Sequence, residues 1–429
     1  MRLSTEAKEL KPSATLAINE LVMKKRAIGQ NILHLGFGES PFPVHLSVQE
    51  ELRQNADKKS YLPTQGIYPL REKVSAFYKY HFNLDYLPEQ IIVGPGSKVL
   101  VFDLLLSLEG PLFIPAPSWV SYQHQAKLMK KPVHYIRTIA QQSYLLSPND
   151  LEEAFQKYSQ QKQIQKILLL NYPNNPTGQS YDPSQLKELA SVARDHNAIV
   201  ISDEIYGLIR FHGNKHQSIA KFYSEGTIIT SGISKDRSLG GFRLGVALLP
   251  SLEHELLKSM ISIGSETWTA TSAPIQYAAI KAYDINSEIT SFISDCTAVH
   301  QLIATYVHKK IENANIRCPF PQGAFYLFPD WNKYSEKLNK MGINSSYDLA
   351  KTLIKKWNIA TLPGSEFGML DKDFCLRIAN CDYDGNLVLN KFRENRKQAL
   401  NGPENFVKSF APRISAACDQ LTRFTESIK

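Results

Sequence analysis

Residues 167–207 read ILLLNYPNNPTGQSYDPSQLKELASVARDHNAIVISDEIYG, and this stretch decides the fold. Its apolar runs, residues 167–170 and 198–201, are uninterrupted, which is typical of strands buried on both faces. Between them Asp182 can cap a helix and Pro183 suits the first helical position. The apolar positions of that helix share one face: Leu186, Leu189, Val192 and Ala193. Strand, helix and strand in this order predict a mostly parallel α/β sheet.

Further apolar runs extend this pattern in both directions along the chain. They lie at residues 91–93, 112–114, 227–230 and 246–249. From about residue 284 the pattern changes, and an amphipathic helix is expected over residues 287–314. The length of 429 residues exceeds one typical domain. We therefore expect a large domain over residues 45–285, and a smaller α+β domain built from residues 1–44 and 286–429.

Composition excludes several classes of function. The net charge of +8 comes from scattered basic residues rather than from a basic arm, so a nucleic-acid surface is not supported. The five cysteines are odd in number and form no CxxC pair, which favours free thiols over disulfides or a metal site. No apolar run reaches membrane-spanning length, and the first residues contain no signal-peptide core. A cytoplasmic protein that binds neither membrane nor nucleic acid is expected.

Polar residues follow three of the predicted strands at their carboxyl ends, where open parallel sheets bind ligands. Residues 171–178 would bring an amide, residues 202–207 a carboxylate and a phenol, and residues 231–235 an amine. A fourth segment, residues 94–98 (GPGSK), follows a strand and opens a predicted helix. The N–H groups and the dipole at such a helix start suit a phosphate group.

Each of these features alone has an ordinary structural explanation. The glycine pair at Gly94 and Gly96 lacks the third glycine of a dinucleotide fingerprint, because Val99 stands there, and no P-loop is present. A lysine in a loop is usually a solvated charge, and an aspartate after a strand is often a helix cap. The order and spacing of the whole set therefore carry the functional argument.

In that order and spacing the chain resembles the class I/II aminotransferases, the aspartate aminotransferase-like enzymes of pyridoxal-phosphate fold type I, over nearly its whole length. The matching segments are YPNNPTG at residues 172–178, DEIY at 203–206, SK at 234–235 with Arg243, LRIA at 376–379, PSWVSY at 117–122 and LKPSAT at 10–15. The resemblance implies pyridoxal 5'-phosphate as cofactor, held in the large domain.

It also implies roles for individual residues around the cofactor ring. Lys235 matches the lysine that binds the cofactor covalently and then carries protons, and Asp203 matches the partner of the pyridine nitrogen. Asn175 and Tyr206 match the residues that hydrogen-bond the phenolic oxygen of the ring. Trp119 matches the aromatic residue stacked on the ring. The implied catalytic set is Lys235, Asp203 and Tyr206.

The implied phosphate site consists of Gly96, Ser97, Lys98 and Ser234, with Arg243 adding a charge-assisted contact. No metal site is expected.

Other matches concern the substrate and the partner subunit. Arg377 matches the arginine that binds the substrate α-carboxylate, and Gly38 and Asn175 match further substrate contacts. Tyr61 resembles a tyrosine that reaches the phosphate of the neighbouring subunit, which implies a homodimer with shared active sites. The chain departs from many relatives at Gly232, where they carry a serine that contacts the phosphate.

The expected function is transfer of an amino group between an amino acid and a 2-oxo acid, within amino acid metabolism and biosynthesis. The alternative on the same scaffold is a pyridoxal-phosphate-dependent carbon–sulfur β-lyase. A regulatory DNA-binding relative is less favoured, because no helix-turn-helix fits before residue 12 and Lys235 is intact. Residues 264–271 contain no arginine, which weakens an aspartate-specific interpretation. Residues 384–403 have no assigned role.

Overall fold

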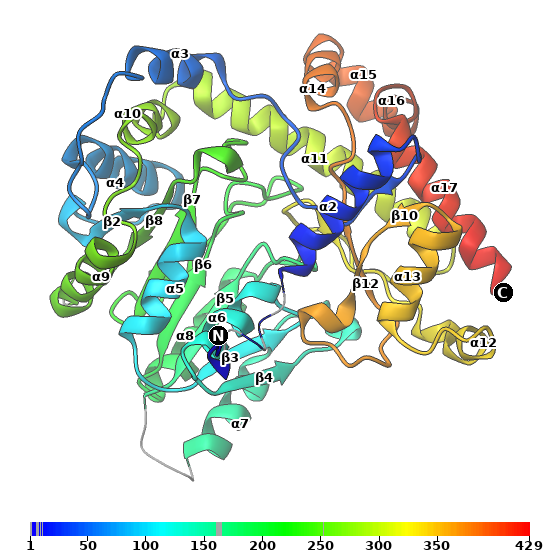
Figure 1. The fold of residues 1–429 in the computed structure, drawn as a ribbon, viewed down its shortest axis with the longest axis horizontal. Helices are drawn as coiled ribbons and strands as arrows, with labels where there is room; N and C mark the ends of the chain where they lie inside the picture. The colour runs from blue at the N-terminus through cyan, green and yellow to red at the C-terminus, as the bar shows by residue number, and fades with distance from the viewer. Residues whose placement is uncertain (1, 6–7, 9, 11, 160–164, 252) are drawn as a thin grey trace.

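The computed structural model describes residues 2–5, 8, 10, 12–159, 165–251 and 253–429. Lys11 of the opening LKPSAT segment lies outside the described residues. The fold is α/β (Figure 1).

A seven-stranded sheet forms the framework of the larger part of the molecule. Its spatial order is β2 (Ile91–Gly94), β8 (Gly245–Leu248), β7 (Thr227–Gly232), β6 (Ile199–Asp203), β5 (Ile167–Asn171), β3 (Leu112–Ala116) and β4 (Val133–Arg137). The strands from β7 to β4 are mutually parallel, whereas β8 is antiparallel to both β7 and β2. The predicted mostly parallel sheet is confirmed.

Helices cover both faces of this sheet, because alternate residues of each strand point to opposite sides. In β5, Leu168 and Leu170 pack into one apolar cluster and Leu169 into another. The helices of this part are α3 (Leu46–Gln54), which packs against α10, and α4 (Tyr68–Phe82), α5 (Ser97–Ser107), α6 (Val120–Leu128), α7 (Pro148–Ser159), α8 (Pro183–Asp195), α9 (His254–Thr267) and α10 (Ala273–Ala282). The predicted helix after Asp182 is confirmed as α8, with Pro183 at its start and Leu186 and Leu189 fully buried.

Most of the remaining elements follow α11 (Ser287–Asn313), the predicted long amphipathic helix. A three-stranded antiparallel sheet contains β11 (Leu362–Pro363), β12 (Leu376–Ala379) and β9 (Tyr326–Leu327), while β1 (Leu33–His34) pairs in parallel with β10 (Ile359–Ala360). The helices here are α2 (Ala14–Ala27), α12 (Ser335–Lys340), α13 (Ser346–Lys356), α14 (Gly385–Glu394), α15 (Arg396–Asn401), α16 (Pro403–Phe410) and α17 (Pro412–Ser427).

Short 3-10 turns connect several of these elements. They span Pro88–Gln90, Ala140–Gln142, Ile219–Lys221, Gly240–Phe242, Asn332–Tyr334 and Gly364–Phe367.

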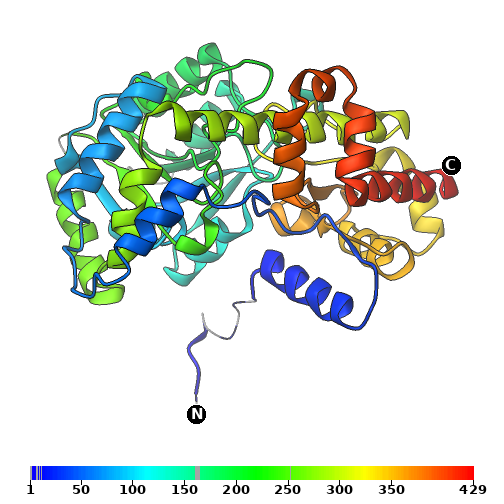
Figure 2. The ribbon, with the colours of Figure 1, turned by 90° about the horizontal axis from the view of Figure 1, so that it is seen from above.

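Figures 1 and 2 show α11 running from beside the large sheet towards the C-terminal helices. The division at residues 44 and 285 stays a prediction. Of the helices in the described part of the chain, none combines the length and apolar character needed to cross a membrane.

Candidate active site

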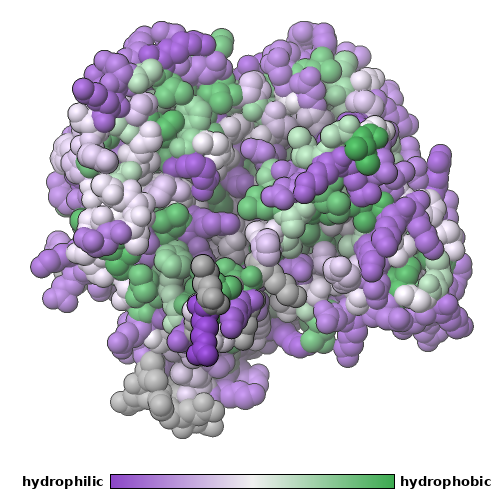
Figure 3. All heavy atoms as spheres, in the orientation of Figure 1, coloured by the Kyte–Doolittle hydropathy of each residue, from purple (hydrophilic) through white to green (hydrophobic). Residues whose placement is uncertain are grey.

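A cleft of about 480 Å³ opens at the carboxyl ends of the central strands. Asn171 ends β5, Asp203 ends β6, and Lys235 follows β7 by three residues. Side chains from the other part of the molecule, among them Tyr326 and Arg377, complete its wall. Figure 3 shows this hollow near the middle of the molecule, with hydrophilic residues beside it. The position agrees with the general site of ligand binding in open parallel sheets.

The structure brings nearly all of the sequence-predicted residues to this cleft. Those on its wall are Gly38, Ser97, Lys98, Trp119, Asn175, Asp203, Tyr206, Ser234, Lys235, Arg243 and Arg377. Gly96 is next to the wall, where it caps α5. Tyr61 is the exception: its side chain is 89% exposed and does not line the cleft of its own chain.

The amine of Lys235 lies inside the cleft. Its Nζ donates a hydrogen bond to the carbonyl oxygen of Gly38 at 2.9 Å. Burial lowers the pKa of Lys235 to about 8, and the guanidinium groups of Arg377 and Arg243 act in the same direction. A substantial fraction of the side chain is therefore neutral near pH 7 to 8, and the neutral amine is the form that attacks carbonyl carbon.

Asp203 lies at the closed end of the cleft, where its carboxylate is almost completely buried. Burial raises its pKa to about 6, and the hydroxyl of Tyr122, which donates to Oδ2 at 2.6 Å, opposes that rise. The N–H of Ile205 donates to Oδ1 at 3.3 Å. The amide of Asn171 holds the backbone carbonyl of Asp203 at 2.8 Å. The carboxylate is thus fixed in orientation and stays charged near neutral pH.

Tyr122 received no role from the sequence, although it lies within the PSWVSY segment. Trp119 precedes α6, and Tyr122 lies three residues later in the first turn of that helix. Their rings meet edge to face, with centroids 5.1 Å apart. The available signal was the place of Tyr122 in the same PSWVSY segment as Trp119.

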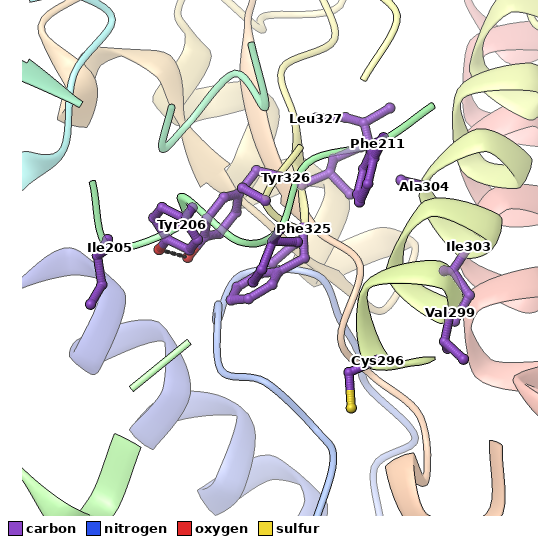
Figure 4. Packing of buried hydrophobic residues seen from close by; sticks show 14 of the residues in the cluster. Ile205, Tyr206, Phe211, Cys296, Val299, Ile303, Ala304, Phe325, Tyr326 and Leu327 are labelled. Atoms are coloured by element: carbon purple, nitrogen blue, oxygen red, sulfur yellow. Dashed lines mark hydrogen bonds between the residues drawn. The ribbon is translucent and has the colours of Figure 1, made fainter. Parts of the chain in front are cut away.

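Tyr326 is a second residue that sequence reasoning missed. Its hydroxyl lies 2.9 Å from the hydroxyl of Tyr206, and the dashed line in Figure 4 marks this contact. Burial raises the pKa of Tyr206 well above its ordinary value, so its hydroxyl stays protonated. A Cβ at Gly38 would overlap the ring of Tyr326, which explains why this position requires glycine.

Arg377, at the centre of β12, is fully buried. Its guanidinium donates to the carbonyl oxygen of Gly36 at 2.6 Å and to Oδ1 of Asn175 at 3.2 Å, and its Nε has no hydrogen-bond partner. Within the described part of the chain, no carboxylate pairs with this charge. A buried cation paired only with neutral oxygens has capacity for an anionic ligand, and its planar fork matches a carboxylate.

The N-terminus of α5 and Arg243 form another part of the cleft wall. Gly96 caps the helix with φ 95°, and a Cβ there would overlap the guanidinium of Arg243. The first N–H groups of a helix lack partners within it, so Ser97 and Lys98 offer donors beside a cation. These are the features of an anion site suited to a phosphate.

Gly232, where the family resemblance leads us to expect a serine, pairs with Gly245 between β7 and β8. A Cβ at Gly232 would lie 2.7 Å from the carbonyl oxygen of Leu244. The tight approach of β8 therefore leaves no room for a serine.

Comparison with known proteins gives consistent results. The family model described as aminotransferase class I and II matches residues 29–386. An aspartate aminotransferase of Bacillus subtilis (strain 168) is 33% identical over 377 residues, covering 86% of this chain and 92% of the relative. An asparagine–oxo-acid transaminase of Streptococcus mutans is 26% identical over 408 residues, covering 93% and 99%. The solved aspartate aminotransferase from Thermus thermophilus with maleate superposes with a TM-score of 0.81 at 26% identity, covering 93% of this chain and 100% of that one.

Proposed function

We propose a role for the cleft on the basis that the chain belongs to the aminotransferase class I and II family. In this role Lys235 binds the cofactor and Arg377 binds the substrate. The protein is a pyridoxal-phosphate-dependent aminotransferase that moves an amino group between an amino acid and a 2-oxo acid. The relatives are named as aminotransferases, so the carbon–sulfur β-lyase alternative is not favoured. The main support for this role of the cleft is the buried guanidinium of Arg377, whose Nε has no hydrogen-bond partner and which lines the same cavity as the amine of Lys235.

The residues present fit pyridoxal phosphate at each of its functional groups. The start of α5 and Arg243 suit the phosphate, and glycine at position 96 leaves the space that the guanidinium occupies. Asp203 suits the ring nitrogen, and half-buried Trp119 offers a flat apolar surface for the ring. The cleft volume of about 480 Å³ lies in the range of small-molecule sites.

Four side chains then divide the work of the reaction. The cofactor supplies an aldehyde that exchanges with amino groups and a ring that withdraws electrons from the substrate Cα. Asp203 keeps a proton on the ring nitrogen, because its buried carboxylate favours a positive neighbour. Lys235, neutral above about pH 8, takes the proton from Cα and returns it. Arg377 would hold the α-carboxylate, and Asn175, whose Oδ1 accepts from Arg377, would be left with its Nδ2 to donate to the phenolic oxygen.

The preferred amino donor is proposed to be L-aspartate. Several close relatives carry that activity in their names, and the wall of the cleft offers Lys98, Ser13 and Thr15 to a second carboxylate. The Nζ of Lys98 lies 4.9 Å from the centre of the Trp119 ring, and the buried Oγ1 of Thr15 has no hydrogen-bond partner. Lys98 would supply the positive charge for the side-chain carboxylate of the substrate, because residues 264–271 contain no arginine that could do so.

We further propose a cytoplasmic homodimer serving amino acid biosynthesis. The exposed position of Tyr61, away from the cleft of its own chain, supports a contact with the partner's site. Five free cysteines suit a reducing compartment.

A donor screen with matched variants tests the proposed function. Purified enzyme should convert L-aspartate with 2-oxoglutarate. Because Lys98→Met keeps the backbone N–H that is assigned to the phosphate, it should lower kcat/KM for aspartate by about tenfold or more while leaving that for L-alanine nearly unchanged. Asparagine as the better donor would redirect the substrate assignment. Pyruvate and ammonia released from cystathionine without any 2-oxo acid would favour the lyase instead.

A further inference from the structure

Two arginines from opposite ends of the chain converge on one carboxylate and one peptide carbonyl. Arg26, in the last turn of α2, contacts both oxygens of Asp382 at 2.8 and 2.9 Å and the carbonyl oxygen of Ile32 at 2.8 Å. Arg413, in the first turn of α17, contacts Oδ2 of Asp382 at 3.0 Å and the same Ile32 carbonyl at 2.5 Å. It also donates to Oδ1 of Asn31 at 2.9 Å. We call Arg26, Arg413 and Asp382 the arginine clamp.

The clamp lies at the start of the segment that enters the active site. Asp382 also accepts the N–H of His34 at 2.8 Å. Two residues further, the carbonyl oxygen of Gly36 accepts from Arg377, and that of Gly38 accepts from Lys235. Residues 32–38 therefore run from the clamp directly to the two side chains assigned to substrate and cofactor.

Asp382 also connects the clamp to Arg377 through the chain itself. It lies five residues after Arg377, in the loop that leaves β12. The N–H of Ala379 in the same strand donates to the carbonyl oxygen of Leu35 at 2.8 Å. The clamp thus joins both segments that flank the guanidinium of Arg377.

At this corner of the molecule the clamp adds to the pairing of β1 with β10 and to a small apolar cluster. Among the described residues, one apolar cluster beneath α2 contains three buried residues, Val22, Ile32 and Ala360, with Ile18 and Ile354 packed against it. Figure 2 shows α2 at the edge of the molecule rather than in its core. Asp382 is only 10% exposed, so its ion pairs are shielded from solvent more than ordinary surface pairs are. Charge-assisted, forked contacts of this kind fix geometry as well as contributing energy.

Neither arginine lies in the segment that the family model matches, which spans residues 29–386, whereas Asp382 does. We propose that Arg413 is a positioning residue for substrate binding: it fixes residues 32–38 and α2, and thereby sets the place of Arg377 and of the cleft wall at Ser13 and Thr15. This inference rests on the proposed function, since it takes Arg377 as the carboxylate site.

The test compares steady-state kinetics of the holoenzyme and three variants at Arg413 and Arg423, the latter an exposed arginine on the same helix. Arg413→Ala should raise KM for both L-aspartate and 2-oxoglutarate by about tenfold, the loss of one charge-assisted contact, with kcat within about twofold and full cofactor content. Arg413→Lys should fall between wild type and Arg413→Ala, because a single ammonium replaces the fork. Arg423→Ala should match wild type.

An Arg413→Ala enzyme that melts earlier but keeps both KM values would overturn the proposal, since Arg413 would then serve stability alone. If that variant does not fold, the KM of Arg413→Lys decides: a rise supports the clamp, and an unchanged value contradicts it. Arg377→Ala separates the two levels. If Arg377→Ala keeps its affinity for substrate, the proposed function is wrong. If Arg377→Ala loses that affinity while Arg413→Ala keeps it, only the proposed role of the arginine clamp is wrong.

Discussion

The hydroxyl of Tyr122 donates to the carboxylate of Asp203, which also accepts a hydrogen bond from the backbone N–H of Ile205. Because this bond lowers the pKa of Asp203, its loss raises that pKa. The active form requires charged Asp203, so activity falls as pH falls through its pKa. Tyr122→Phe should therefore move the acidic limb of the pH–rate profile to higher pH and slow transamination by about tenfold.

The matched control is Tyr80→Phe, at an exposed tyrosine on α4. Its pH profile should coincide with that of the wild type. If the acidic limb of the pH–rate profile is not shifted in Tyr122→Phe, the hydrogen bond from Tyr122 does not lower the pKa of Asp203.

The sequence predicted the role of a residue where that residue lies in a short segment resembling a family motif, as Lys235 and Asp203 do. Tyr326 could not be found this way. Its partner Tyr206 lies 120 residues earlier, and only the docking of β9 against the end of the large sheet brings the two hydroxyls together. Contacts made by folding leave no local signal in a single sequence.

At the scale of elements, the pairing of β7 with β8 depends on two facing glycines. Gly232→Ala should destabilise the protein by about 1–3 kcal/mol, because the added Cβ meets the carbonyl oxygen of Leu244 at 2.7 Å and cannot move it without disturbing the ladder. Chemical denaturation measures this difference. Gly241→Ala, where a Cβ has open space, serves as the control. Equal stability of the two variants would contradict the account of why serine is absent at position 232.

The central strands were predictable because each is a continuous apolar run. The edge strand β4 was not, since of its five residues only Ile136 is buried and its sequence, VHYIR, lacks such a run. The two-residue strands β1, β9, β10 and β11 are too short to leave a periodic pattern. Residues 384–403, to which the sequence assigned no role, form α14 and α15. They lead to α17, which contains Arg413.

For the whole molecule, the proposed homodimer predicts complementation between two inactive subunits. Co-expressed Tyr61→Ala and Lys235→Ala chains should form mixed dimers with one complete site, and the mixture should be more active than either parent. The control pair is Lys235→Ala with Arg423→Ala. Both chains of this pair keep Tyr61, so the activity of each site depends only on whether its own Lys235 is present. Light scattering that finds an active monomer would contradict the shared site.

The central claim is that Lys235 carries the cofactor, and peptide mass spectrometry after borohydride reduction tests it most directly. Reduction fixes the pyridoxyl group on the amine that holds it. The wild-type protein should show the adduct on the peptide containing Lys235, and Lys235→Ala should show none while still binding cofactor through Arg243 and Asp203. A pyridoxyl group on another lysine, or none in the wild type, would contradict the account.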